Sequence, residues 1–131
     1  MYAFKQFRPS AHIYGGDIDT KILFQDVGIC TTFVDQLNPA SITQALASYG
    51  KSYDMIIDDG LHSPLANINV ISASAPFLAS GGWIVIEDIS PDARSIWRLA
   101  AQLMGDSFEC YLIDDAQSIT HSLLFAALKK Y

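Results

Sequence analysis

Short β-branched and aromatic runs alternate with segments of helical spacing, and this alternation most limits what the chain can fold into. The strand-like runs occupy residues 12–17, 30–34, 53–57 and 83–87. Each is rich in the residue types that favour strands. Strands that alternate with helices form βαβ units, which use right-handed crossovers and give a mainly parallel sheet.

Helix signals fall in the connections between these runs. Apolar residues recur at helical spacing from Ser41 to Tyr49, and Gly50 supplies a stop. Two further helices are expected to begin at Ser63-Pro64 and Ser90-Pro91, where a capping residue precedes a proline suited to the first helical position. We therefore predict a Rossmann-like α/β fold with a mostly parallel sheet and helices on both of its faces.

The last third of the chain adds a different pattern. Runs from Phe108 to Ile113 and from Leu123 to Leu128 predict a C-terminal antiparallel strand pair, joined by a polar loop around Asp114-Asp115. With 131 residues, half of them apolar, the chain is expected to form a single domain, residues 1–131, with a packed core. A short helix could also open at Thr20.

Composition excludes several classes of partner. The net charge of −6 and the scattered cations argue against a nucleic-acid partner, because phosphate binding needs a cationic face. The chain has no apolar run near the ~20 residues of a membrane span, and no signal-peptide pattern. Cys30 and Cys110 lie in apolar runs and are expected to be free thiols in a reducing compartment. We therefore expect a cytoplasmic protein.

Acidic residues follow each of the four predicted parallel strands. In open α/β sheets ligands bind at the carboxyl ends of the strands, so these acids are expected to lie together at one edge. They are Asp17 and Asp19, Asp35, Asp58 and Asp59, and Glu87 and Asp88. The richest of these ends is Asp58-Asp59-Gly-Leu-His62, which places two carboxylates and a potential base directly after a strand.

Each of these acidic ends also has a structural interpretation. The segment from Asp58 to His62 could be a polar turn with a solvated histidine. The pair Glu87-Asp88 could be an acidic turn that leads into the next helix and is favoured by the helix dipole. Asp17 and Asp19 could cap a helix at Thr20 instead of contacting a ligand. Trp83 and Trp97 are expected in the core.

Four motifs in order carry a resemblance to a known family. They are Tyr-Gly-Gly-Asp-Ile-Asp at 14–19, Val-Asp-Gln at 34–36, Ile-Ile-Asp-Asp-Gly-Leu-His at 56–62 and Gly-Gly-Trp-Ile-Val-Ile-Glu-Asp at 81–88. Together they resemble class I S-adenosylmethionine-dependent methyltransferases, nearest the metal-dependent macrolide sugar O-methyltransferases and the related cephalosporin-hydroxylase-like group. The resemblance runs from about residue 11 to the end.

The resemblance implies a role for each acidic end. In such enzymes an acid after the second strand binds the ribose hydroxyls of the cofactor, and another after the third strand meets its adenine. The matching cofactor-binding residues here are Asp17, Asp19, Asp35, Gln36 and Asp58. The implied Mg²⁺ ligands are Asp59, Glu87 and Asp88, whose oxygens suit a hard cation. His62 matches the general base that takes the proton of the acceptor, a sugar or polyol hydroxyl, and natural-product biosynthesis is one setting that the resemblance implies.

The chain departs from the family at its N-terminal end. The family's glycine-rich loop, which follows a first strand, has no counterpart here, because Gly15-Gly16 belongs to the second strand. We expect a truncated methyltransferase domain that lacks the first strand of the family fold, and its activity is an open question. The alternative is a non-catalytic remnant that self-associates, since exposed strand edges favour a homo-oligomer.

Overall fold

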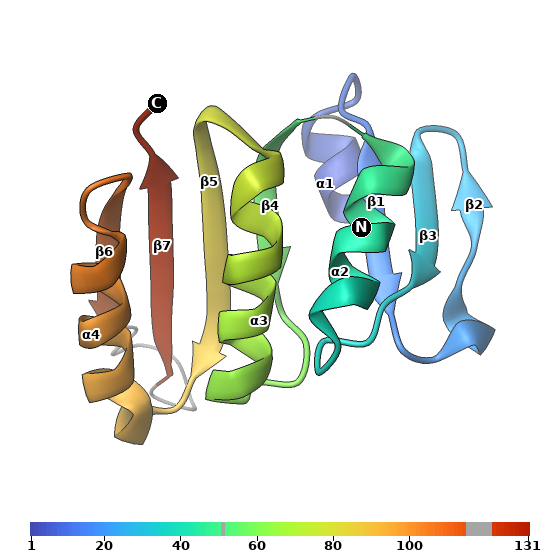
Figure 1. The fold of residues 1–131 in the computed structure, drawn as a ribbon. Coiled ribbons are helices and arrows are strands. Elements are labelled where there is room, and N and C mark those ends of the chain that lie inside the picture. The colour runs from blue at the N-terminus through green and yellow to red at the C-terminus, as the bar shows by residue number, and fades with distance from the viewer. Residues whose placement is uncertain (51, 115–121) are drawn as a thin grey trace.

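The computed structural model describes residues 1–50, 52–114 and 122–131 (Figure 1). The helices are α1 (Tyr2–Phe7), α2 (Pro39–Tyr49), α3 (Pro64–Ser74) and α4 (Arg94–Met104), with 3-10 turns η1 (Thr20–Ile22), η2 (Ala75–Phe77) and η3 (Pro91–Ala93). The strands are β1 (Ile13–Asp17), β2 (Gln25–Asp26), β3 (Ile29–Phe33), β4 (Tyr53–Asp58), β5 (Leu78–Ile89), β6 (Phe108–Asp114) and β7 (Leu123–Lys129). Asp115, from the expected polar loop, lies outside the described residues.

The strands form two sheets, one of three strands in the order β1-β3-β2 and one of four in the order β4-β5-β7-β6. β1 pairs in parallel with β3, and β4 in parallel with β5, whereas β7 is antiparallel to both β5 and β6. The predicted parallel strands and the C-terminal antiparallel pair are confirmed. Figure 1 shows β1 and β4 as the facing edges of the two sheets, and no strand of the described residues lies between them.

Two short elements differ from the sequence-based expectation. The segment that begins at Thr20 forms only the single turn η1, because Gln25 and Asp26 pair with Cys30 and Ile29 as the antiparallel strand β2. α1 was not expected as a helix. A strand of two residues is too short to show a hydrophobic periodicity, so only its pairing with β3 in the structure identifies it.

Of the two caps predicted from sequence, Ser63 forms its hydrogen bond, whereas the Ser90 side chain makes no cap bond: the turn η3 follows Ser90, and α4 begins only at Arg94. A cap at Asn38 was not predicted. The side chain of Asn38 accepts from the backbone of Ala40 at the start of α2, and Ser63 Oγ accepts from Ala66 N at the start of α3. In both helices a proline follows the cap, where its missing N–H costs nothing. No helix in the described ranges is long and apolar enough to cross a membrane.

The main core lies between the four-stranded sheet and the helices α3 and α4. Ile84 and Ile86 on β5 and Phe125 on β7 are fully buried, and Trp97 on α4 packs against Phe125 with 4.8 Å between ring centroids. The prediction that Trp97 is a core residue is confirmed. A second cluster of Ile42 on α2 with Val70 and Ala73 on α3 joins the helices next to the two sheets.

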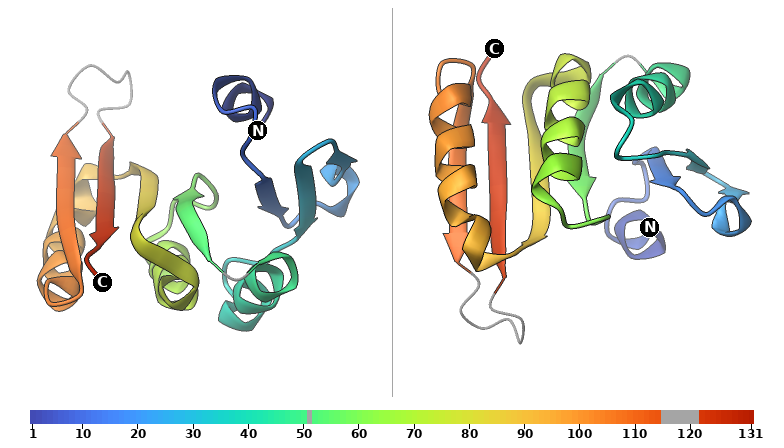
Figure 2. Two further views of the ribbon diagram at one scale, coloured as in Figure 1. Left: turned by 90° about the horizontal axis from the view of Figure 1, so that it is seen from above. Right: turned by 60° about the horizontal axis from the view of Figure 1, so that its bottom comes forward.

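The opposite face of the four-stranded sheet carries apolar side chains that remain exposed. Figure 2 shows α2, α3 and α4 on one side of the sheets and α1 on the other, beside the three-stranded sheet. Because side chains alternate along a strand, Met55 and Ile57 of β4 point away from the core, as do Tyr111 and Ile113 of β6. Their exposed fractions are 52%, 36%, 41% and 50%.

Candidate metal and cofactor site

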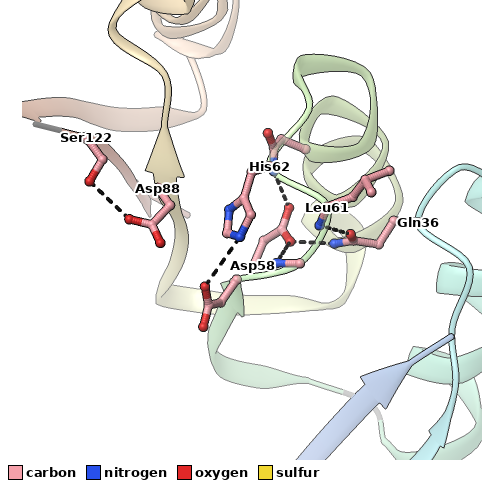
Figure 3. A network of polar contacts seen from close by, with 9 residues as sticks. Gln36, Asp58, Leu61, His62, Asp88 and Ser122 are labelled. Atoms are coloured by element: carbon pink, nitrogen blue, oxygen red, sulfur yellow. Dashed lines mark hydrogen bonds and ion pairs between the residues drawn. The ribbon is translucent and has the colours of Figure 1, made fainter. Parts of the chain in front are cut away.

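The carboxyl ends of β4 and β5 bring three of the predicted site residues together. Asp59 and His62 lie in the turn that follows β4, and Asp88 lies near the end of β5. One ligand atom from each residue lies within 4.8 Å of the others. His62 Nε2 is 4.0 Å from Asp59 Oδ1, and all three residues are exposed to solvent. Figure 3 shows His62 and Asp88 on this edge of the sheet.

Two members of this cluster have an unusual backbone conformation. His62 has φ of 51° and Asp88 has φ of 50°, and they are the non-glycine residues with positive φ in the described chain. Such left-handed conformations are uncommon outside glycine and concentrate at functional sites, where the surrounding structure holds them. Ser122 Oγ donates to Asp88 Oδ1 at 3.0 Å, which helps to orient that carboxylate (Figure 3).

Glu87, predicted as a third carboxylate ligand, lies beside the cluster but is not one of its three members. Burial raises the pKa of Glu87, and the nearby carboxylates of Asp59 and Asp88 raise that pKa further, whereas His62 lowers it. Neighbouring carboxylates that raise the pKa of Glu87 also repel it when it is ionised, and a bound cation would relieve this repulsion. Its role as a metal ligand stays a prediction.

Asp58 is buried, with 3% of its surface exposed, and it accepts hydrogen bonds on both oxygens. Oδ1 accepts from the Gln36 side-chain amide and from Gly60 N at 3.2 Å. Oδ2 accepts from Asn67 Nδ2 on α3 at 2.8 Å. Asn67 is itself buried, and sequence reasoning missed it, because an asparagine inside a helix gives no motif. The predicted cofactor contact of Asp58 stays untested.

The remaining predicted cofactor residues lie on the three-stranded sheet and its loops. Asp17 Oδ1 accepts from Asp19 N at 2.8 Å, and Asp19 Oδ1 accepts from Lys21 N at 2.9 Å as the cap of η1. Asp35 Oδ1 accepts from Leu37 N at 2.9 Å. The structure thus shows a local capping role for these carboxylates. Their predicted contacts to a cofactor remain predictions.

A pocket of about 310 Å³ opens beside the cluster, between the N-terminal ends of α3 and α4. Its lining includes His62, Asn67 and Asp92 together with the apolar side chains of Pro64 and Ile96. Trp97 also lines it, and among the described residues nothing accepts a hydrogen bond from the buried indole Nε1. A pocket with apolar walls and a few polar groups is typical of a small-molecule site.

Comparison with known proteins identifies related sequences and folds. The chain is 36% identical over 85 residues to demethylmacrocin O-methyltransferase of Streptomyces fradiae, a match that covers 65% of this chain and 21% of that protein. It is 34% identical over 85 residues to mycinamicin VI 2''-O-methyltransferase of Micromonospora griseorubida, with the same coverage. No family model matches the chain.

Among solved structures, the chain superimposes on the MycE methyltransferase of the mycinamycin biosynthetic pathway, determined in complex with Mg, SAH and mycinamycin VI. The TM-score is 0.74 at 22% identity, over 97% of this chain and 38% of MycE. The matched segment is about a fifth of the length of the curated relatives. The chain therefore has the class I methyltransferase fold, and its sequence resembles that of the sugar O-methyltransferases of macrolide biosynthesis.

Proposed function

We propose that this chain is the metal-binding and acceptor-binding part of an S-adenosylmethionine-dependent O-methyltransferase that acts on a sugar or polyol hydroxyl. The observation that carries the proposal is the cluster of Asp59, His62 and Asp88 at the carboxyl ends of two parallel strands. The sequence matches to macrolide sugar O-methyltransferases support the substrate class, and the MycE complexes with Mg and SAH support the cofactors.

The donor set fits a hard divalent cation such as Mg²⁺. Such ions prefer oxygen ligands and are held by one or two carboxylates together with water and substrate oxygens. Asp59 and Asp88 supply exposed carboxylates, and Glu87, whose pKa these two carboxylates raise, is proposed as a further ligand. The bound cation would lower the pKa of the acceptor hydroxyl.

We assign His62 the role of proton acceptor and not that of metal ligand. Its imidazole lies within 4.8 Å of both carboxylates and also lines the pocket beside the cluster, where an acceptor would bind. In the proposed reaction the acceptor oxygen attacks the methyl carbon of S-adenosylmethionine, the carbon–sulfur bond breaks, and His62 takes the hydroxyl proton. Asp17, Asp19 and Asp35 would contact the nucleoside of that cofactor from the three-stranded sheet.

Titration calorimetry and Mn²⁺ electron paramagnetic resonance test the two cofactors separately. We expect one Mn²⁺ site that Mg²⁺ displaces, and we expect S-adenosylmethionine to bind weakly, because no glycine-rich loop is present in this sequence. The absence of Mn²⁺ binding at millimolar concentrations would overturn the metal assignment. If Mn²⁺ binds but S-adenosylmethionine gives no heat of binding, the chain is a metal-binding module and the proposed cofactor contacts are wrong.

A second candidate function is non-catalytic self-association, and the exposed sheet face favours it. Met55 and Ile57 on β4 and Tyr111 and Ile113 on β6 are exposed apolar side chains on the two outer strands, on the uncovered side of the four-stranded sheet, and exposed apolar surface often marks an interface. Sedimentation analysis of the wild type and an Ile57→Lys variant tests this. We expect a dimer that the lysine dissociates, whereas a wild-type monomer up to about 100 μM would contradict it.

A further inference from the structure

We propose that Gln36 is a positioning residue that holds the turn 58–62, and with it Asp59 and His62, from the other half of the molecule. Gln36 lies in the loop after β3, next to the three-stranded sheet, while the turn follows β4 of the four-stranded sheet. The claim that this turn serves a metal rests on the proposed function. The mechanical role of Gln36 does not.

The Gln36 side chain bonds the turn with both ends of its amide. Its Nε2 donates to Asp58 Oδ1, and its Oε1 accepts from Leu61 N at 2.7 Å (Figure 3). The backbone of Gln36 is also held, because its carbonyl accepts from Asn69 Nδ2 on α3 at 3.0 Å. One side chain therefore fixes both the first residue of the turn and the residue before His62.

Packing does not hold this turn. Gly60, Leu61 and His62 are exposed, and the Leu61 side chain is 55% exposed, so hydrophobic burial contributes little to their position. His62 nevertheless keeps a left-handed backbone that costs energy and persists only where the surroundings impose it. On the N-terminal side of His62 the constraint is the hydrogen bond from Leu61 N to Gln36, and on the other side Ser63 is held as the cap of α3.

Gly60 supplies an independent sign that the fit between loop and turn is close. A Cβ built on Gly60 would overlap all three terminal atoms of the Gln36 amide. The φ of Gly60 is not in the left-handed region, so the glycine is required by this close approach and not by its backbone conformation. Gly60→Ala should therefore displace Gln36 while leaving that residue in the chain.

The first experiment needs no metal. Gln36→Met keeps the length of the side chain and removes both hydrogen bonds, and Gln102→Met on the exposed face of α4 is the matched control. In Gln36→Met and in Gly60→Ala we expect the Leu61 amide to exchange hydrogen at least about tenfold faster, with β5 and β7 unchanged. The His62 amide–Hα coupling, which reports φ, should also change. Unaltered Leu61 exchange and His62 coupling in both variants would overturn the proposal.

The second experiment measures Mn²⁺ affinity in the folded state of the same variants. We expect about a five- to tenfold weaker affinity for Gln36→Met and Gly60→Ala and no change for Gln102→Met. A lowered melting temperature with unaltered Mn²⁺ affinity would show that Gln36 only stabilises the fold. If the wild type binds no Mn²⁺, the proposed metal function fails, and the exchange and coupling data alone decide the role of Gln36.

Discussion

The two sheets differ in how they are held, although each is built around a parallel strand pair. The four-stranded sheet has a continuous core with α3 and α4, whereas β1 of the three-stranded sheet has no buried residue at all. On that side Ile29 and Thr31 of β3 are buried, and Ile42 of α2 packs against α3. The cluster of Asp59, His62 and Asp88 thus lies on the well-packed half, and most predicted cofactor residues lie on the other.

The halves are joined by aromatic contacts and hydrogen bonds, in addition to the packing of Ile42 on α2 against Val70 and Ala73 on α3. The Tyr14 ring on β1 stacks on Tyr49 of α2 at 4.7 Å and meets Tyr53 of β4 edge-on at 5.9 Å. Tyr53 Oη donates to the Leu46 carbonyl at 2.8 Å, and Gln36 ties the loop after β3 to the turn after β4. The four-stranded half thus has a continuous core of its own, whereas the three-stranded half buries less apolar surface and meets the rest of the chain through these contacts.

Removal of a core side chain from each half should give the largest difference between the halves, measured as the loss of unfolding free energy. Phe125→Ala is expected to cost about 3–5 kcal/mol of unfolding free energy, because it opens a cavity against Trp97. Ile29→Ala should cost about 2 kcal/mol, the low end for such a change, because Ile29, although buried, belongs to neither of the two core clusters. Urea unfolding followed by tryptophan fluorescence measures both. Equal losses would contradict the proposed difference between the halves.

Hydrogen exchange of the wild type should show the same difference without any mutation. Amides of β5 and β7 are expected to exchange only through global unfolding, while those of β1 and β3 exchange through openings at least about 2 kcal/mol cheaper. The physical reason is the smaller buried apolar surface on the three-stranded side. Indistinguishable protection in all four strands would show that the sheets unfold as one unit.

Asp88→Asn separates the function of the cluster from its stability. Asparagine tolerates positive φ and keeps an oxygen for Ser122, so the unfolding free energy should change by less than about 0.5 kcal/mol. Loss of the charge should weaken Mn²⁺ binding at least about tenfold, or about 1.4 kcal/mol. Asp106→Asn, at an exposed turn, is the control. Full retention of Mn²⁺ affinity in Asp88→Asn would remove this residue from the site.

Glu87→Gln should have the smallest effect, and the size of that effect depends on pH. The folded state raises the Glu87 pKa above its ordinary value. Protonated Glu87 therefore favours the folded state at low pH, and this contribution to the unfolding free energy is lost as pH rises through the raised pKa. At pH 7 the neutral glutamine should therefore raise the unfolding free energy, by about 0.5 kcal/mol or less. Below about pH 4 the difference should vanish. A less stable variant at pH 7, measured without metal, would contradict this.

Much of the fold could be predicted from local patterns. Strand-forming runs and the cap at Ser63 depend on neighbours in the chain, so their physical signals are local and the structure bears them out. The same signal at Ser90 gave no cap bond. The proximity of Asp59, His62 and Asp88 could be anticipated, because the carboxyl ends of neighbouring parallel strands share an edge. The short strand β2 could not, since its pairing with β3 is its defining feature.

Sequence alone determined the class of the fold, the residues at its ligand-binding edge and the family that those residues resemble. Only the tertiary structure decided that the sheet is divided between β1 and β4, that Asp58 is buried beneath three hydrogen-bond donors, and that Gln36 bridges the two halves. The reason is physical. Strand and cap propensities act over a few residues, whereas a side-chain bond such as that between Gln36 and Asp58 joins positions 22 residues apart and exists only after both halves have folded.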